Sequence, residues 1–172
     1  MASFGDRFIG ALKLDARAYE DVEADPNALG QAIVVVAVSA VCAAIGSAGL
    51  FGTSGMISAL LASLVGWVVW SGVTFLIGTK VLPMPQTRAD LGQLLRTTGF
   101  AAAPGVIRIL GVVPFLGWIT SFVAFVWMLA AFVVAVRQAL DYDSTPRAVG
   151  VCLIGWVAYL IIAWLLHGLV RL

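Results

Sequence analysis

One charged residue lies inside a long apolar stretch and is the leading candidate for a binding role. Residues 99–113 read GFAAAPGVIRILGVV and place Arg108 between two isoleucines. A charged side chain at the centre of a bilayer costs roughly 2.5–3.5 kcal/mol on insertion scales, so Arg108 needs a partner or access to water. Helical rise puts it about 9 Å from Pro114, and we expect it to snorkel to the outer surface as an anchor. Two alternatives stay open: binding of an anionic lipid headgroup or solute, and a contact between subunits.

A proline precedes Arg108 by about one helical turn. Pro104 lacks a backbone donor and frees the carbonyl of Phe100, so we expect a kink in this helix. Neighbouring helices can satisfy the freed carbonyl inside a membrane. We therefore group Gly99, Phe100 and Pro104 with Arg108 as candidate residues of a lipid, solute or packing site.

Two hydroxyl residues lie in the middle of another apolar stretch. Ser71 and Thr74 follow Trp67 and Trp70 in the run LVGWVVWSGVTFLIG. Small and hydroxyl residues let membrane helices approach closely and hydrogen-bond across the contact. We expect a helix-packing role, with a polar cavity lined by Ser71, Thr74 and Arg108 as the alternative.

The remaining reactive side chains do not form a catalytic set. His167 is the only histidine, and no Asp or Glu lies in any long apolar run. Cys42 and Cys152 fall in different runs, so we expect two buried thiols. The sequence shows no nucleophile with its base and no phosphate-binding loop. We therefore predict a protein that is not an enzyme and that has no cofactor or metal; the absence of intramembrane acids counts against proton-coupled transport.

The overall composition is that of an integral membrane protein. The chain is 62% hydrophobic and 11% charged, with a mean hydropathy of +1.04. A soluble domain is about half apolar and a quarter charged. We predict an all-α fold, a polytopic helical bundle in the bilayer. The formal net charge of +1 gives no electrostatic case for nucleic acid.

The elements divide into an N-terminal segment and a membrane domain. In residues 1–27, Phe4, Phe8 and Leu12 recur at four-residue spacing, which predicts an amphipathic helix. It lies either in the membrane interface or against the protein itself. Asp25 and Pro26 predict the start of the next helix. Residues 28–172 form a membrane domain with five transmembrane helices, at about 28–50, 57–82, 91–113, 118–140 and 148–170.

Glycine, proline and threonine residues predict where these spans begin and end. A glycine-rich turn follows residue 46, Pro83 and Pro85 end the second span, and Thr87 opens the next helix. PFLG at 114–117 predicts a hairpin. Five spans place the termini on opposite sides, and eight of the ten basic residues fall on the N-terminal side. The positive-inside rule then predicts a cytoplasmic N-terminus and a C-terminus outside.

Three stretches carry a resemblance to a known family. They are LKLDARAYEDVEADP, TRADLGQLLRTTGFAAAP and RQALDYDSTPRAVGV, in this order along the chain. The sequence resembles the Yip domain family (Ypt/Rab-interacting proteins), in its bacterial branch. The resemblance implies a five-span plan with a cytoplasmic N-terminus. Gly99, Phe100 and Pro104 sit where eukaryotic members, which are associated with vesicle trafficking, small GTPases and membrane shaping, carry a Gly-Tyr motif. Their long N-terminal region has no counterpart here, so we expect no GTPase binding.

Two main hypotheses of function follow. The first is a non-enzymatic protein that organises the membrane or scaffolds trafficking-type partners. The second is a transporter or channel-like carrier for a lipid or small solute; a third is an accessory subunit of a larger membrane complex. We expect the partners to be the lipid bilayer, an anionic lipid near Arg108, and a second copy or another membrane protein. The expected location is the bacterial cytoplasmic (inner) membrane.

Overall fold

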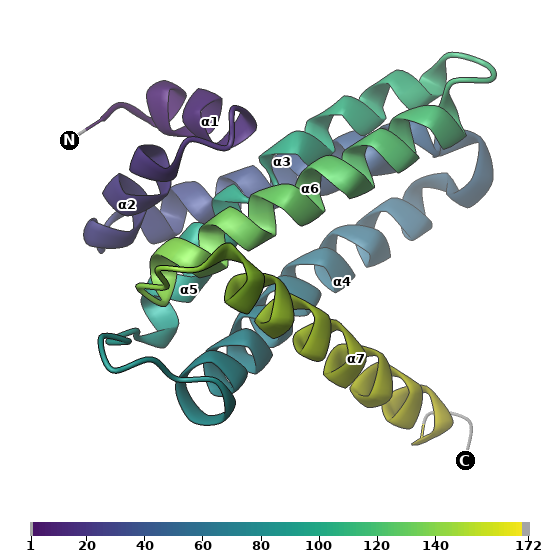
Figure 1. Ribbon diagram of the computed structural model, residues 1–172. Coiled ribbons are helices and arrows are strands. Elements are labelled where there is room, and N and C mark those ends of the chain that lie inside the picture. Colours follow the sequence, from purple (N-terminus) through teal and green to yellow (C-terminus); the bar gives the residue numbers. More distant parts are fainter. Residues whose placement is uncertain (1, 170–172) are drawn as a thin grey trace.

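The chain folds as helices throughout the part that the structure describes. A computed structural model describes residues 2–169, without the side chains of 48–56, 162, 163 and 165–169, so the predicted helix end near His167 lies outside the described side chains. Among the described residues there is no strand (Figure 1). The elements are α1 (Phe4–Leu12), α2 (Ala16–Ala24), α3 (Ala28–Gly46), α4 (Ala48–Leu76), the π-helix η1 (Ile77–Val81), α5 (Leu91–Phe100), the 3₁₀-helix η2 (Ala103–Val112), α6 (Gly117–Ala139) and α7 (Thr145–Leu169).

Three of the described helical segments are long and apolar enough to cross a membrane. They are α3, residues Ile57–Val81 of α4 and η1, and α6. The part of α7 with described side chains, Thr145–Ile161, is apolar but shorter. η2 packs against both α3 and α6, and α4 packs against α3. In Figure 1, α7 crosses α4 and diverges from the other helices towards its C-terminal end. Most of the outward-facing side chains of these helices are hydrophobic, as a lipid environment requires.

The predicted span at 91–113 is not one kinked helix. α5 ends at Phe100, and the chain continues as the ten-residue 3₁₀-helix η2 with Pro104 near its start. Proline cannot donate the backbone hydrogen bond that would continue the α-helix. Runs of 3₁₀-helix longer than three or four residues are uncommon, and this one packs along both α3 and α6.

The N-terminal segment forms two short helices rather than one. Ser3 and Asp6 make a capping box at α1, and Asp15 caps α2. Gly10 allows the two to cross closely, since a Cβ there would lie 2.4 Å from the methyl group of Ala18. Both helices pack on the bundle, through α2 against α5 and α6 and through α1 against η2. The segment is therefore held against the protein itself, and its contact with the membrane interface stays a prediction.

Two predicted helix starts are wrong. Asp25 does not cap α3; it ends α2, and its carboxylate accepts a hydrogen bond from the Asn27 amide at 2.9 Å. Thr87 does not open α5, which begins at Leu91 with Asp90 as N-cap. The Thr87 hydroxyl instead donates to the carbonyl of Leu140. In each case the side chain that looks like a cap stabilises a neighbouring turn.

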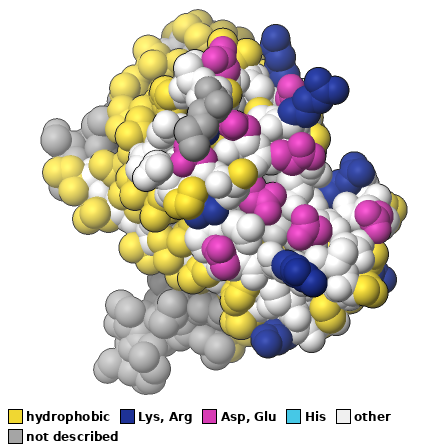
Figure 2. All heavy atoms as spheres, turned by 90° about the vertical axis from the view of Figure 1, so that its left-hand side faces the viewer, with side chains coloured by type: hydrophobic (Ala, Val, Ile, Leu, Met, Phe, Trp, Pro, Cys, Tyr) yellow, Lys and Arg dark blue, Asp and Glu magenta, His cyan; other side chains and the backbone are white. Residues whose placement is uncertain are grey.

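The α3–α4 and η2–α6 connections are short. Only Ser47 separates α3 from α4, so the predicted glycine-rich turn is mostly helix. The hairpin before α6 is present, with Phe115 at a positive φ of 69°. Charged side chains gather instead at the end formed by α1, α2 and the loops that precede α5 and α7 (Figure 2). We call this end the polar cap.

Candidate functional site

Arg108 lies in a row with two glycines on one face of η2. A 3₁₀-helix has three residues per turn, so residues three apart are stacked above one another. Gly105, Arg108 and Gly111 therefore share the same face. Gly105 leaves room for the Arg108 guanidinium, and Gly111 lets the neighbouring backbone approach.

The backbone of α3 approaches η2 closely at Gly46. A Cβ on Gly46 would lie 1.9 Å from the carbonyl oxygen of Arg108, and a Cβ on Gly111 would lie 2.8 Å from the carbonyl oxygen of Gly46. Such distances are far below van der Waals contact. The end of α3 and the second half of η2 therefore meet backbone to backbone, and only glycine fits at these two positions.

The guanidinium of Arg108 turns back along η2 rather than towards the hairpin at 114–117. Its Nε donates to the Gly105 carbonyl at 3.3 Å, and its Nη2 lies 3.5 Å from Ser39 Oγ and 3.0 Å from Met128 Sδ. The expected snorkelling to the outer surface is wrong for this conformation. Gly105 has no side chain to block the turn, and the cluster of α3, η2 and α6 atoms supplies the polar contacts.

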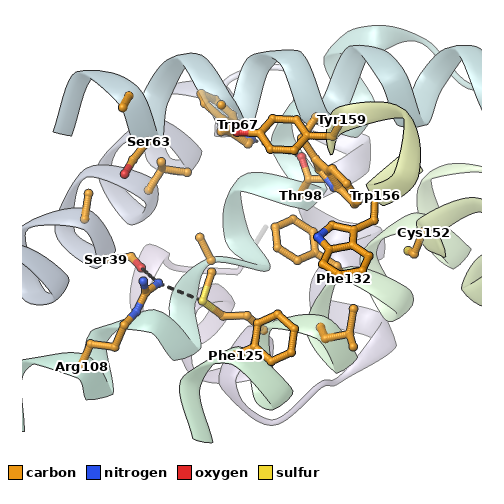
Figure 3. Close-up of a pocket in the computed structure, with 18 of the residues that line it drawn as sticks. Ser39, Ser63, Trp67, Thr98, Arg108, Phe125, Phe132, Cys152, Trp156 and Tyr159 are labelled. Atoms are coloured by element: carbon orange, nitrogen blue, oxygen red, sulfur yellow. Dashed lines mark hydrogen bonds between the residues drawn. The ribbon is translucent and has the colours of Figure 1, made fainter. Parts of the chain in front are cut away.

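Arg108 lines a cavity of about 710 Å³ that lies among α3, α4, α5, η2, α6 and α7. This volume falls within the roughly 300–1,000 Å³ of typical ligand pockets. Figure 3 shows Arg108 and Ser39 at one end, with Trp156, Tyr159 and Cys152 towards the other. The walls are mainly aromatic and aliphatic, and they are formed by Val36, Ser39, Ala40, Ala62, Ser63, Gly66, Trp67, Trp70, Thr98, Ala102, Arg108, Ser121, Phe125, Met128, Leu129, Phe132, Cys152, Leu153, Trp156 and Tyr159.

The cavity is elongated and opens at the side of the bundle. Its lining on α6 runs from Ser121 to Phe132, which is roughly 16 Å of helix. Phe125 and Trp156 line it and are 56% and 50% exposed. The exposed lining residues belong to α4, α6 and α7, so the opening faces the side of the bundle rather than the polar cap.

The two hydroxyl candidates on α4 do not line the cavity. Ser71 is fully buried, and its hydroxyl lies 2.8 Å from Thr98 Oγ1 and donates to the Trp67 carbonyl. Thr74 is fully buried, and its hydroxyl has no hydrogen-bond partner among the described residues. The structure therefore brings Arg108 together with Ser39 and Met128, and it places Ser71 and Thr74 behind the cavity wall.

The residues around the predicted kink serve the packing of the bundle. Gly99 meets α3, where a Cβ would lie 2.7 Å from the methyl group of Ala32. Phe100 is fully buried, and its ring centroid lies 6.2 Å from that of Phe4 in an edge-on contact. Pro104 is buried at the start of η2. None of these three lines the cavity.

Sequence reasoning missed Ser39, Met128 and Thr98 as neighbours of the candidate site. Each comes from a different element, and no local pattern links them to Arg108. One available signal was the three-residue spacing of Gly105, Arg108 and Gly111, which matches the period of a 3₁₀-helix and marks a face on which an arginine has room to turn.

A separate set of charged contacts holds the polar cap together. Arg7 is 1% exposed and joins three elements: its Nε lies 2.6 Å from Asp21 Oδ2, its Nη2 lies 2.9 Å from Asp25 Oδ2, and its Nη1 donates to Gln31. Burial alone would lower the pKa of Arg7, but Asp21 and Asp25 raise it overall. The hydrogen bond from the Asn27 amide and then Arg7 lower the pKa of Asp25, so both charges persist at neutral pH.

Glu23, in the polar cap, has a pKa close to neutral pH. Burial and then the charge of Asp141 raise the pKa of Glu23 to about 7, against a lowering effect of Arg96. Its carboxylate accepts a hydrogen bond from Gln93 Nε2 at 3.1 Å. This carboxyl group therefore lies at the contact between α2 and α5.

The thiols and other possible ligands make no metal site in the described part of the chain. Cys42 on α3 and Cys152 on α7 are free thiols; Cys152 is buried as predicted, whereas Cys42 is only half-buried. No three His, Cys, Asp or Glu side chains with described positions come together to hold a metal. The functional question therefore centres on the cavity and on the cap.

The comparisons with known proteins agree with the resemblance found in the sequence. No curated protein and no solved structure matches the chain. The family comparison matches the Yip1 domain over residues 9–166, which includes α2, every apolar helix, η2 and Arg108. The resemblance to the Yip domain family is thereby confirmed. With its apolar helices, this chain is a membrane protein and belongs to the Yip1 domain family.

Proposed function

We propose that this chain is a non-enzymatic membrane protein that organises bilayer lipid by holding a lipid molecule in its lateral cavity. The observation that carries the proposal is the cavity itself, which has about 710 Å³ of space between the helices and mainly apolar walls. Because this space opens at the side of the bundle, bilayer lipid rather than the protein's own side chains would fill it.

The aromatic walls suit a hydrocarbon chain. The Trp70 ring packs edge-on against Phe132 and Tyr159, with centroid separations of 6.0 and 6.2 Å. The three rings therefore form one aromatic wall of the cavity. Because Phe125 and Trp156 are also half exposed at the side of the bundle, a chain can pass from the bilayer to this wall.

The proposal includes five membrane crossings, with the polar cap in the cytoplasm of a bacterial cell. α3, α4 with η1, α6 and α7 supply four of them. α5 followed by η2 supplies the fifth. Ten α-helical and ten 3₁₀ residues together span roughly 35 Å; the first turns of α5 contact the polar cap through Gln93 and Arg96, and the remainder is close to the bilayer core of about 30 Å. Eight of the ten Lys and Arg residues fall on the side of the cap, and the positive-inside rule, which counts basic residues only, then supports its cytoplasmic location.

A second function, scaffolding at the membrane surface, is favoured by one feature of α1. Phe4 and Ile9 are 41% and 51% exposed on the cap. These side chains offer an apolar contact to the membrane interface or to a partner protein. This role and lipid holding are compatible, because the cavity and α1 lie on different parts of the bundle.

Photo-crosslinking tests the lipid-holding function directly. Phosphatidylcholine with a diazirine near the end of one acyl chain is reconstituted with the full-length protein and irradiated. We expect labelled peptides from α6 around Phe132 and from α7 around Trp156. Ala62→Phe places a ring in the cavity from α4 and should reduce this labelling by roughly tenfold, because it occupies the space for the chain.

Leu61→Phe is the matched control. Leu61 is adjacent in sequence and 58% exposed, and it does not line the cavity. Its labelling should equal that of the native chain. Equal labelling of the Ala62→Phe and Leu61→Phe proteins at the α6 and α7 sites would reject a lipid chain in the cavity.

A further inference from the structure

We propose that the lipid held in the cavity is anionic and that its phosphate binds the guanidinium of Arg108. This inference rests on the proposed lipid-holding function and adds the chemical class of the ligand. It follows from the charge balance at Arg108, from the donors that the guanidinium leaves free, and from the direction of the cavity.

The charge of Arg108 has no counter-ion in the described part of the protein. Both ion pairs found among the described residues belong to Arg7. The three contacts of Arg108 are to a carbonyl, a hydroxyl and a thioether, and none of these groups carries a charge. Intramembrane arginines are normally paired or reach water. A phosphate entering the cavity would supply the missing negative charge.

The guanidinium is also placed to donate. Its Nε and Nη2 are engaged, whereas Nη1 has no hydrogen bond to any residue that the structure describes. The contact with Ser39 is long, at 3.5 Å, so this hydroxyl can turn to a stronger acceptor. Phosphate oxygens accept short, charge-assisted hydrogen bonds from guanidinium groups, frequently two in parallel. Arg108 and Ser39 together therefore form a donor pair for one phosphate.

The direction of the cavity matches an amphiphile. Arg108 and Ser121 lie towards the end of the bundle that carries the hairpin at 114–117, and Ser121 is only four residues from the start of α6. The cavity continues from there towards Phe132 and Cys152, and the aromatic walls lie along this inner part. A lipid would place its phosphate at the inward-turned guanidinium, beside Ser39 and Met128, and its acyl chain further along the cavity towards Phe132 and Cys152.

The test measures which lipid stays with the purified protein. Full-length protein is equilibrated in detergent with equal amounts of phosphatidylglycerol and phosphatidylcholine that carry the same acyl chains, and retained lipid is counted by native mass spectrometry. We expect the native protein to prefer phosphatidylglycerol. Arg108→Gln should lower its retention by roughly tenfold or more, the effect of losing a charge-assisted hydrogen bond, while phosphatidylcholine retention stays the same.

Arg88→Gln is the matched control for charge, because Arg88 is exposed in the loop before α5 and should leave the preference unchanged. An unaltered preference in Arg108→Gln would overturn the inference. If Ala62→Phe also lost both lipids in that case, the lipid-holding function would stand without its anionic specificity. If Ala62→Phe retained both lipids, the lipid-holding function itself would fail.

A soluble phosphate compound is the other source of the same chemistry. Glycerol 3-phosphate added at millimolar concentration should not displace phosphatidylglycerol, because it lacks the acyl chain. Complete displacement would assign the site to a soluble anion and would overturn the lipid assignment.

Two further variants keep the inference testable if Arg108→Gln does not fold. Gly105→Ala leaves the charge in place, but its methyl group would lie 2.7 Å from Arg108 Nη2 and 2.0 Å from Ser39 Oγ. It should displace the guanidinium and lower the preference severalfold. Arg108→Lys should lower it too, since an ammonium group cannot reproduce the planar pair of donors. Full preference in both folded variants would overturn the inference.

Discussion

The Nη2 nitrogen of Arg96 lies 2.5 Å from the carbonyl oxygen of Glu23. Its Nε donates to the carbonyl of Val22 at 3.2 Å. Both carbonyls belong to the last turn of α2, whose carbonyl groups have no partners within the helix. A buried cation from α5 thus caps α2 and also complements the negative end of its dipole. This contact fastens the N-terminal helices to the segment that continues into η2.

Replacing Arg96 should therefore release the N-terminal helices before the bundle unfolds. Arg96→Ala leaves two carbonyls without their donor, at a cost of roughly 1–3 kcal/mol for unsatisfied buried groups. We expect faster hydrogen exchange in residues 4–25, with little change in α3 and α6. Arg88→Ala, which alters an exposed arginine of the same region, should leave exchange unchanged. Equal exchange in the two variants would contradict the capping role.

Loss of Arg7 should have a larger effect on the same segment. Arg7→Leu removes the cation from Asp21 and Asp25 at once, and it leaves the buried Asp25 carboxylate without its partner. We expect protease cleavage within residues 13–27 that the native protein resists. Arg17→Leu is the control, because Arg17 is exposed on α2. Cleavage at the same rate in both variants would show that the Arg7 ion pairs do not hold α1 and α2 in place.

The docking of α2 should weaken as the pH rises towards 8. The folded protein raises the pKa of Glu23 to about 7, above the ordinary value of 4.5. The folded state therefore binds the proton more tightly than the unfolded state, and the resulting stabilisation is complete below about pH 4.5 and is lost as the pH rises through 7. Hydrogen exchange of α2 should be slower at pH 5.5 than at pH 8, after correction for the intrinsic rate. Glu23→Gln should abolish this difference, and a difference that persists would assign it to another group.

The glycine contact between α3 and η2 should not accept a methyl group. Gly46→Ala would bring a Cβ to 1.9 Å from the Arg108 carbonyl oxygen, and overpacking of this kind costs roughly 1–3 kcal/mol or more. We expect a lower melting temperature in detergent. Gly30→Ala, on the same helix, has nothing within 4 Å of its new Cβ and should be neutral or slightly stabilising. Equal melting temperatures would show that α3 and η2 do not meet this closely.

Cysteine labelling tests the proposed five crossings. In a chain whose Cys42 and Cys152 are replaced by alanine, single cysteines are placed at Ser144 and at Phe115. Both positions are exposed, and Phe115 is 91% exposed in the hairpin before α6. An impermeant maleimide added to intact cells should label the Phe115 position and should label Ser144 only after the membrane is opened. Labelling of both positions in intact cells would reject the proposed arrangement.

The apolar helices and the family were accessible from the sequence because hydrophobic runs and turn residues are local signals. The same signals misplaced the starts of α3 and α5, because Asp25 and Thr87 bond to partners outside the helices they precede. The 3₁₀ form of η2 was not predicted either. Pro104 predicted an interruption of the α-helix, but no local signal showed that the backbone after it would pack closely against Gly46.

The candidate site was predicted only in its central residue. Arg108 stood out by its charge, whereas its partners Ser39 and Met128 come from helices that are distant in the sequence and carry no special pattern. The cavity depends on how α7 diverges from α6, and no local signal encodes an angle between helices. The sequence could therefore single out Arg108 as a buried charge, but it could not show the cavity beside it.

The stacking of Gly105, Arg108 and Gly111 exists only while η2 is wound with three residues per turn. In an α-helix, residues three apart are offset by about 60° around the axis, so the arginine would leave the face it shares with the two glycines. The same rewinding would shorten the ten residues from about 20 Å to about 15 Å, drawing the hairpin at 114–117 inward. In the proposed five-span arrangement, a thicker bilayer would therefore favour the longer winding, in which the arginine faces the cavity.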